Sequence, residues 1–506
     1  MINTLVRGMR RGNVWLGLAV VLAGSSPSVG TAAQQDKSKT GAAKKDGPST
    51  KGAAPATKKA DEPKKEEVKA EEAAAPTGSY EIFRDPRAEE AMEKLKKVGK
   101  DCPDRVASNV KSMAGGGSSV DRDAIKQLVQ GMVFRLTDKA NIDAVVAPPP
   151  NKTPSRAVSV AVENLIDPLI SAKALKNTGF LNVYNQELLE SLPPLLNNHL
   201  ITRIQAAIVL AQIGTPQVVP IFVKELKDPK QTIWVKLEAT RGISQVVDGG
   251  RNADALSATE AANTAKVIVD YLVAEAEQDL PWPVEFRAIE ALGALRQAAL
   301  PASPQKAEIA AVLMKYLADG DERPEVRAQA AAALGMLRVS SATSKYNFPL
   351  VAYYDGLLSA AIGERVNAIF PDNIPQSEYL TGLLVAPLYQ CFSGLENSRE
   401  SGLLKTPTAA SSIGYLKQVS DLQSAVAKAT VELIRAPTGL RKDLKPELGN
   451  RVSALKTFLA KNPPKDFHLV PGGEEYRVEA EPAVAQAAAP KAAAPAAAKA
   501  KAGGGR

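Results

Sequence analysis

Apolar residues recur at three- and four-residue spacing in several segments between residues 196 and 340. Such spacing places the apolar side chains on one side of a helix. The segments with this pattern are residues 216–229, 261–277 and 306–320. Each is followed by a turn with Asp, Pro or Gly and then by a second, alanine-bearing segment. The pattern therefore predicts units of helix, turn and helix.

The alanine-bearing segments repeat one another. "VEFRAIEALGAL", which begins at Val284, aligns without a gap to "VRAQAAAALGML", which begins at Val326. Earlier copies are "TRIQAAIVLAQI" from Thr202 and "VKLEATRGISQV" from Val235, so the successive offsets are 33, 49 and 42 residues. Offsets in this range are typical of two-helix repeat arrays. In such an array the four consecutive alanines, Ala330–Ala333, permit an approach that larger side chains would prevent.

The stretch "DERPEVRAQAAAALGML" resembles the second helix of the HEAT repeats, a family of armadillo-like α-solenoids, with Asp321 and Arg327 in the two polar positions. The resemblance implies that these two residues form hydrogen bonds between adjacent repeats. The other copies depart from the pattern: Asn197 replaces the acid before Arg203, and Glu285 stands where Arg is expected. The resemblance to the HEAT repeats covers roughly residues 195–340 and implies a fold rather than an activity.

The predicted fold is therefore all-α, an α-α superhelix or solenoid of HEAT-like helix pairs with disordered low-complexity tails at both ends. Residues 196–340 form the repeats. Residues 80–195 are expected to be an N-terminal helical or capping region, and residues 341–470 irregular C-terminal helical repeats, because terminal repeats must present a polar outer face.

The N-terminus has the features of an export signal at residues 1–33. Three arginines precede the apolar run Val14–Gly24, and a region of small residues follows. The run has about 11 residues, whereas a membrane-spanning helix needs roughly 20. Cleavage near Ala33 would give an exported chain, periplasmic or extracellular, without a transmembrane span.

Both tails have biased compositions. Residues 34–79 are a Lys/Ala/Glu/Pro linker, and residues 471–506 are an Ala/Pro/Lys tail. Neither contains enough large apolar residues to offset the entropy of ordering. The net charge of +8 comes from the ends: residues 1–33 contribute +3, residues 34–78 +2 and residues 482–506 +4, which leaves −1 for residues 79–481. No nucleic-acid partner is expected.

The candidate reactive residues are few and far apart in sequence. His199 is expected to be an exposed residue of a turn before a helix, and His468 to lie at the edge of the folded region. Cys102 and Cys391 pair only if the fold brings their Cα atoms within about 7 Å, and burial of Cys391 as a small apolar residue is the favoured alternative. The sequence contains no metal-binding or phosphate-loop motif. It predicts no enzyme activity, no cofactor and no metal.

Trp282, in "DLPWPVE", precedes a repeat helix. It is interpreted either as a hydrophobic staple across the turn or as an exposed anchor for a partner. A second tryptophan, Trp234, lies near the start of another repeat helix.

The leading hypothesis is a non-catalytic scaffold for protein–protein interactions. Partners of unknown identity would bind the surface of the second helices, and the candidate binding residues are Arg203, Lys236, Trp282 and Arg327. One alternative is an envelope-organising protein whose tails contact anionic polymers. A less favoured one is an enzyme, because some related solenoids are lyases that attach bilin pigments, and no pigment-binding motif is found here.

Overall fold

The computed structural model describes residues 83–97, 103–146, 155–275, 280–300, 303, 306–338, 346–396, 400–405 and 410–477. All of them belong to the unit that comprises Tyr80–Arg506, and the other unit, Asn3–Ser79, lies outside them. The predicted signal peptide, the predicted linker and residues 478–506 of the predicted tail also lie outside. In the described parts the regular structure is helical, without strands and with one isolated bridge between His468 and Glu475. The predicted all-α class is confirmed.

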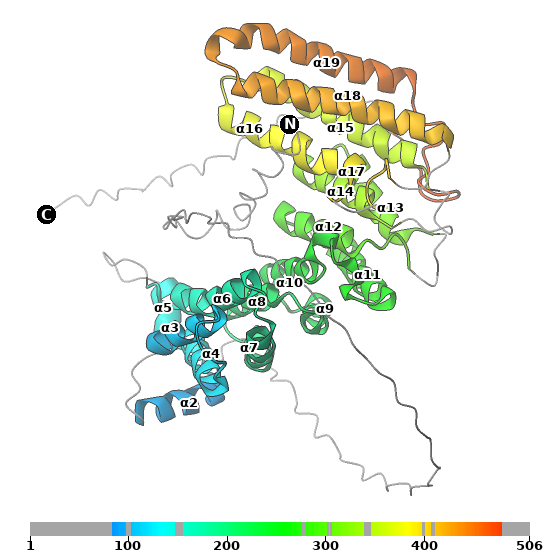
Figure 1. Cartoon of the computed structure of the whole chain (residues 1–506). Coiled ribbons are helices and arrows are strands. Elements are labelled where there is room, and N and C mark those ends of the chain that lie inside the picture. Colours follow the sequence, from blue (N-terminus) through cyan, green and yellow to red (C-terminus); the bar gives the residue numbers. More distant parts are fainter. Residues whose placement is uncertain are drawn as a thin grey trace, which may run out of the picture. The chain divides into compact units, whose positions relative to one another are not determined.

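The N-terminal region contains six helices of the described chain (Figure 1): α2 (Pro86–Lys97), α3 (Pro103–Ala114), α4 (Arg122–Thr137), α5 (Lys139–Val146), α6 (Ala157–Ala174) and α7 (Thr178–Ser191). Helix α4 packs against α2, α3, α6 and α7. Its buried side chains include Ile125, Leu128, Val129, Met132 and Leu136, at the three- and four-residue spacing of one helix face. The helical character predicted for residues 80–195 is therefore confirmed in the parts of this range that the structure describes.

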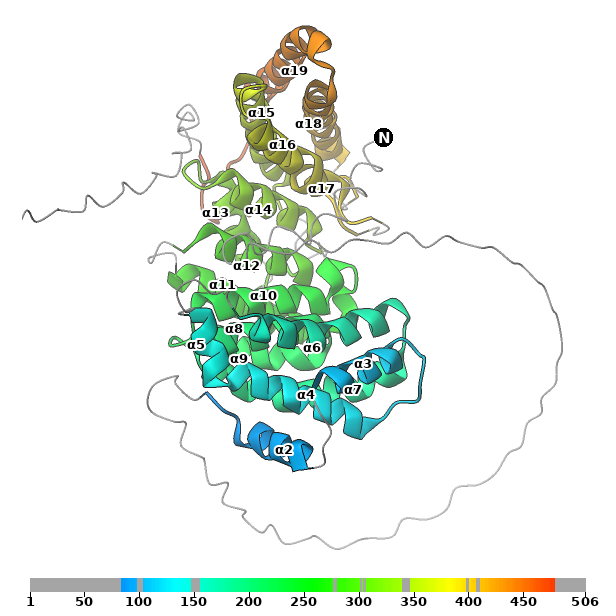
Figure 2. The ribbon, with the colours of Figure 1, turned by 90° about the vertical axis from the view of Figure 1, so that its left-hand side faces the viewer.

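The central region consists of two alternating kinds of helix. We call α9 (Val219–Lys227), α11 (Ala258–Glu275) and α13 (Glu308–Ala318) the first helices. The second helices are α8 (Leu200–Ile213), α10 (Ile233–Val246), α12 (Trp282–Leu295) and α14 (Pro324–Met336). Helix α10 packs against both α8 and α12, and α12 also packs against α14 (Figure 2). The first helices likewise follow one another, α9 beside α11 and α11 beside α13.

The alanines of α14 are enclosed on all sides. Ala330–Ala333 are between 0% and 2% exposed. Helix α14 contacts α12 and α13 before it and α15 and α17 after it. The helices approach so closely that a Cβ on Gly293 would lie 2.8 Å from the Cα of Ala333. Small residues are required here because larger ones would overlap the neighbouring helix, as the sequence predicted.

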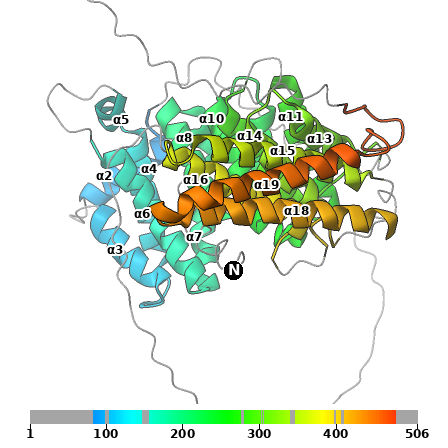
Figure 3. The same ribbon diagram turned by 90° about the horizontal axis from the view of Figure 1, so that it is seen from above.

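The C-terminal region has longer helices: α15 (Phe348–Ile369), α16 (Ile374–Leu383), α17 (Tyr389–Ser393), α18 (Ala410–Arg435) and α19 (Arg441–Lys461). Helices α15, α18 and α19 pack against one another along their lengths (Figure 3). A short π-helical turn, Leu384–Leu388, joins α16 to α17. Tyr476 then ties the end of the described chain to α13, since its hydroxyl donates to the carbonyl of Ala311 at 3.1 Å. Among the helices described, none has both the length and the apolar character needed to cross a membrane.

Candidate interaction surface

Three of the second helices begin with two apolar residues. Helix N-termini usually favour polar caps and acidic residues in the first turn. The apolar pairs are Leu200-Ile201 in α8, Ile233-Trp234 in α10 and Trp282-Pro283 in α12. Leu200 is 39% exposed and Trp234 is 44% exposed, and the other four are half-buried. The apolar side chains of these first turns are therefore not fully buried in the core.

The first turns of neighbouring second helices lie together at one edge. Arg203, in the first turn of α8, donates from Nη1 to Oε1 of Gln231, two residues before the start of α10, at 2.9 Å. The guanidinium of Arg323, the cap residue of α14, lies 5.0 Å from the ring centroid of Trp282 in α12. Each contact joins two helix starts, so α8 runs in the same direction as α10, and α12 in the same direction as α14.

The apolar character continues into the second turn. Ile204, Leu237 and Phe286 occupy equivalent positions in α8, α10 and α12 and are half-buried. They lie three or four residues after the first-turn pairs and therefore on the same helix side. The edge of Phe286 meets the ring of Trp282, with centroids 6.4 Å apart and planes at 87°. We call this set the apolar face: Leu200, Ile201, Ile204, Ile233, Trp234, Leu237, Trp282, Pro283 and Phe286.

Ion pairs border the apolar face on α10 and α12. Arg241 pairs with Glu238 at 3.2 Å, and Arg287 pairs with Glu290 at 2.6 Å. Glu238 is 3% exposed, and burial raises its pKa, which the nearby charge of Arg241 opposes. In α10 the acid precedes the base, and at the equivalent positions of α12 the base precedes the acid. Each helix therefore pairs its own opposite charges, and this polar border carries little net charge.

Three of the four residues predicted to bind a partner are buried. Arg203, Lys236 and Arg327 are only 5%, 3% and 6% exposed. The expectation that they lie on an open surface is wrong, because their repeat position faces other parts of the molecule and not the solvent. Their charged groups are placed for contacts inside the molecule.

The contacts of these buried cations differ from repeat to repeat. The Lys236 ammonium lies 5.0 Å from the ring centroid of Tyr271 in α11. Arg327 donates from Nε to the carbonyl of Leu317 in α13 at 3.2 Å. At the equivalent position of α12, Glu285 accepts a hydrogen bond from the hydroxyl of Tyr316 at 3.4 Å. The inter-repeat hydrogen bonds implied for Asp321 and Arg327 stay a prediction.

The two tryptophans differ in exposure, and the one not predicted to bind a partner, Trp234, is the more exposed. Trp282 is the first residue of α12, half-buried between Phe286 and the Arg323 guanidinium. Its contact with Phe286 lies inside α12, whereas a hydrophobic staple starts from a residue before the N-cap. The Trp282 ring forms part of the apolar face. Trp234 is the more exposed. The repeat alignment contains the signal that would have identified it, because Trp234 aligns with Ile201 and Pro283.

His199 is more enclosed than the sequence suggested. It is the N-cap residue of α8 and is half-buried, not exposed. Its Nδ1 accepts the backbone N–H of Ile201 at 3.3 Å, and its ring stacks on Phe83 with centroids 5.4 Å apart. His468, by contrast, pairs with the neighbouring Asp466 at 2.6 Å.

A buried polar cluster lies between α15 and α17. Ser359 donates from Oγ to Oδ1 of Asp355 at 3.3 Å, and the Cys391 thiol adjoins the same carboxyl. Burial raises the pKa of Asp355 well above its ordinary 3.8 and also raises the pKa of Cys391. Cys391 is fully buried and free, as favoured, whereas Cys102 lies outside the described residues. Burial therefore favours the protonated, neutral form of both groups.

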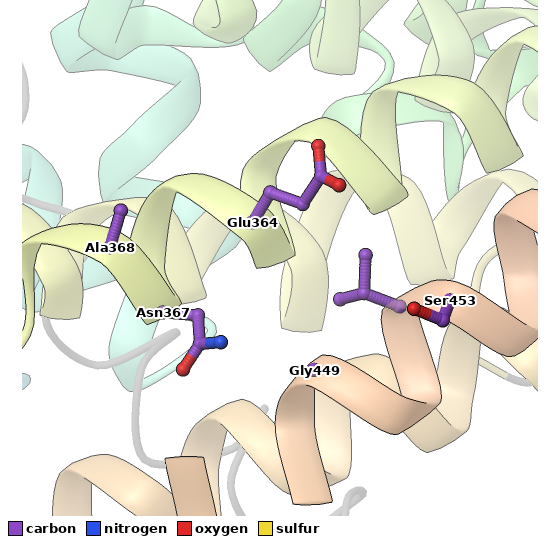
Figure 4. Close-up of a pocket in the computed structure, with 6 residues that line it drawn as sticks. Glu364, Asn367, Ala368, Gly449 and Ser453 are labelled. Carbon is purple, nitrogen blue, oxygen red and sulfur yellow. The ribbon is translucent and has the colours of Figure 1, made fainter. Parts of the chain in front are cut away.

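A small hollow of about 280 Å³ lies between α15 and α19 (Figure 4). Its lining consists of small and polar side chains: Glu364, Asn367, Ala368, Gly449, Val452 and Ser453. Glu364 is already paired with Lys456 at 2.8 Å. In the described ranges no three or more His, Cys, Asp or Glu residues are grouped to hold a metal ion. The apolar face is the stronger candidate site, because Trp234 and Leu200 expose large apolar side chains there.

No family model, no curated protein and no solved structure matches this chain.

Proposed function

We propose that this protein is a non-catalytic scaffold for protein–protein interactions, built as a solenoid of HEAT-like helix pairs. The succession of contacts from α8 through α10 and α12 to α14 supports this architecture. Solenoids of this kind present extended surfaces on which partners bind. The apolar face lies across three of these helices and provides such a surface.

The observation that carries the proposal is the exposure of Trp234 within the apolar face. Trp is among the residues that contribute most to binding when they become buried in an interface. Contiguous apolar surface with a polar border is the usual anatomy of a protein interaction site. The self-neutralised ion pairs of α10 and α12 supply that border. The partner would contribute apolar side chains opposite Trp234 and few unpaired charges.

The proposed compartment is extracytoplasmic, periplasmic or extracellular. The arginine-led apolar run and the small residues before Ala33 support export. The partner would then be an exported protein or an exported segment of an envelope protein.

Capture from the native exported fraction tests the proposal. The tagged full chain is compared with its Trp234→Ala and Phe286→Ser variants and with a control, Ile170→Ser, which alters a 55% exposed side chain on α6. The full chain and the control should recover the same protein, and the two face variants should not. With the purified partner, Trp234→Ala should raise Kd at least about thirtyfold, as for an interface hot spot.

The tails provide the competing explanation. If the face variants recover the partner as well as the full chain does, the apolar face is not the binding site. If recovery instead depends on the Lys-rich tails and disappears with added salt, the envelope-organising alternative is favoured, because contacts between exposed charges are screened.

A further inference from the structure

Two turns of the C-terminal region lie at the same end of its helices (Figure 1). One comprises residues 370–374, from the end of α15 to the start of α16, and the other comprises residues 436–440, between α18 and α19. The Arg441 guanidinium lies 5.0 Å from the ring centroid of Phe370, and Lys445 donates from Nζ to the carbonyl of Phe370 at 2.7 Å. The start of α19 is therefore in contact with the turn between α15 and α16.

Each of the two turns exposes a large apolar side chain. Ile374, the first residue of α16, is 39% exposed, and Leu440, the residue before α19, is 56% exposed. Their neighbours in residues 371–375 and 437–440 are exposed as well. Phe370, at the base of the first turn, is by contrast buried. The two apolar side chains thus lie on exposed turns, and the base of the first turn is fixed in the core.

Cations outnumber carboxylates around the two turns. Residues 370–374 and 435–445 contain two carboxylates and four cations, which are Asp372, Asp443, Arg435, Arg441, Lys442 and Lys445. The next acids along α18 and α19, Glu432 and Glu447, are each paired with a basic residue of their own helix. Arg365 of α15 and Glu378 of α16 have opposite charges and cancel. This end of the C-terminal region therefore carries an excess of positive charge.

This combination of side chains has a recognised counterpart. Exposed apolar side chains among lysines and arginines are typical of segments that lie in the surface of an anionic bilayer. The apolar side chains enter the boundary between headgroups and acyl chains, and the cations are attracted to the lipid phosphates. The border of the apolar face differs, because its charges are paired with one another. The charge around the two turns thus favours an anionic surface as the partner.

We propose that the two turns form a peripheral binding site for a bilayer that contains anionic phospholipid. Ile374 and Leu440 enter the headgroup region, and the exposed cations Arg435 and Lys442 contact lipid phosphates. The site goes beyond the scaffold function and does not depend on it. It would attach the protein to a membrane surface through helices other than those of the apolar face.

Sedimentation with lipid vesicles tests the site in the full chain. Vesicles of equal parts phosphatidylglycerol and phosphatidylcholine should bind the parent, and vesicles of phosphatidylcholine alone should bind it far less. The double variant Ile374→Ser/Leu440→Ser should bind the anionic vesicles at least about tenfold more weakly, because it removes the inserted apolar groups. The control Ile413→Ser, which alters a 46% exposed side chain on α18, should bind like the parent.

The charge contribution is tested with the same vesicles. Lys442→Gln should weaken binding about fivefold, as for the loss of one cation near an anionic surface. Lys417→Gln, at an exposed position of α18, should not. A parent that does not bind anionic vesicles would overturn the proposal. Equal binding by the parent and the Ile374/Leu440 double variant would overturn it as well.

An environment-sensitive label separates the turns from the Lys-rich tails. In a Cys102→Ser background, Leu440→Cys is labelled with nitrobenzoxadiazole and compared with labelled Ile413→Cys, since Cys391 is buried. Anionic vesicles should raise the emission of the first label at least about twofold, because it enters an apolar boundary, and leave the second unchanged. Vesicle binding without this increase would assign the binding to the tails and overturn the proposal. An equal increase with soluble polyphosphate would also overturn it, in favour of an anionic polymer.

These measurements involve no protein partner, so their outcome is separate from that of the capture experiment. Successful capture without vesicle insertion would refute the membrane site and retain the scaffold function. Vesicle insertion with failed capture would do the reverse.

Discussion

Gly335 lies where α14 meets the backbone of α17. A Cβ at this position would lie 2.2 Å from the carbonyl oxygen of Cys391 and 2.6 Å from its Cα. We expect Gly335→Ala to lower the free energy of unfolding by about 1–3 kcal/mol, because backbone atoms on both sides must move. Urea denaturation followed by circular dichroism measures this.

Gly382 in α16 provides the matched control. A Cβ there would meet nothing within 4 Å. Alanine is the better helix former by about 0.5–1 kcal/mol, so Gly382→Ala should leave stability unchanged or raise it. Equal loss in both variants would contradict the close approach of α14 and α17.

Asp355 should make the protein less stable as pH rises. Its unfolded pKa is near the ordinary 3.8, and burial raises the folded value well above it. Stability is thus fully present below the unfolded pKa and falls by about 1.4 kcal/mol per pH unit until the folded pKa is reached. In Asp355→Asn this loss should be absent, so the variant gains stability relative to the parent between pH 5 and pH 8.

Urea unfolding at both pH values tests this, with the exposed Asp372→Asn as control. Parallel curves for parent and Asp355→Asn would show that the carboxylate is not held neutral.

At the scale of the helix, the repeat pattern predicted which segments form the helices α9 to α14 and that Ala330–Ala333 are enclosed. It did not predict which side of each second helix meets solvent. Hydrophobic periodicity identifies a buried side only when the other side is polar. In α14 almost every residue is buried, and in α10 the cation Lys236 is buried while Trp234 is exposed. The pattern therefore did not reveal that Arg203, Lys236 and Arg327 are buried while Trp234 is exposed on one of the same helices.

Charge reversal at a stacking position tests this correction. In Lys236→Glu the carboxylate would be buried against the negative face of the Tyr271 ring, where the ammonium is now favoured. We expect a loss of about 3 kcal/mol or more in the free energy of unfolding, as for an uncompensated buried charge. Lys417→Glu, at an exposed position of α18, should change stability by less than about 0.5 kcal/mol. A Lys236→Glu variant as stable as Lys417→Glu would restore the interpretation of Lys236 as a surface residue.

For the whole molecule, the least predictable features are contacts between segments distant in sequence. Arg296 donates to the carbonyl of Met336 at 3.1 Å and to that of Glu400 at 2.8 Å. Leu403 donates its N–H to the carbonyl of Cys391 at 3.0 Å. These hydrogen bonds fix residues 400–405 against α14 and α17. The spacing of apolar residues along the chain does not predict them. The helical character of residues 341–470 was predictable from its amphipathic segments, but this packing was not.

The succession of helix contacts makes a prediction about how a local defect spreads. Helix α14 packs on α12, α13, α15 and α17, whereas α4 packs on the other N-terminal helices and α8. In an array with neighbour-to-neighbour contacts, stability is approximately a sum of local contributions. Hydrogen exchange of Gly335→Ala should therefore show lost protection in peptides of α12–α17 and unchanged protection in α3–α7, since exchange reports local opening. Peptides from the parent chain under the same conditions give the reference. An equal loss of protection in both regions would mean that the described chain opens as one cooperative unit, and the array interpretation would have to be abandoned.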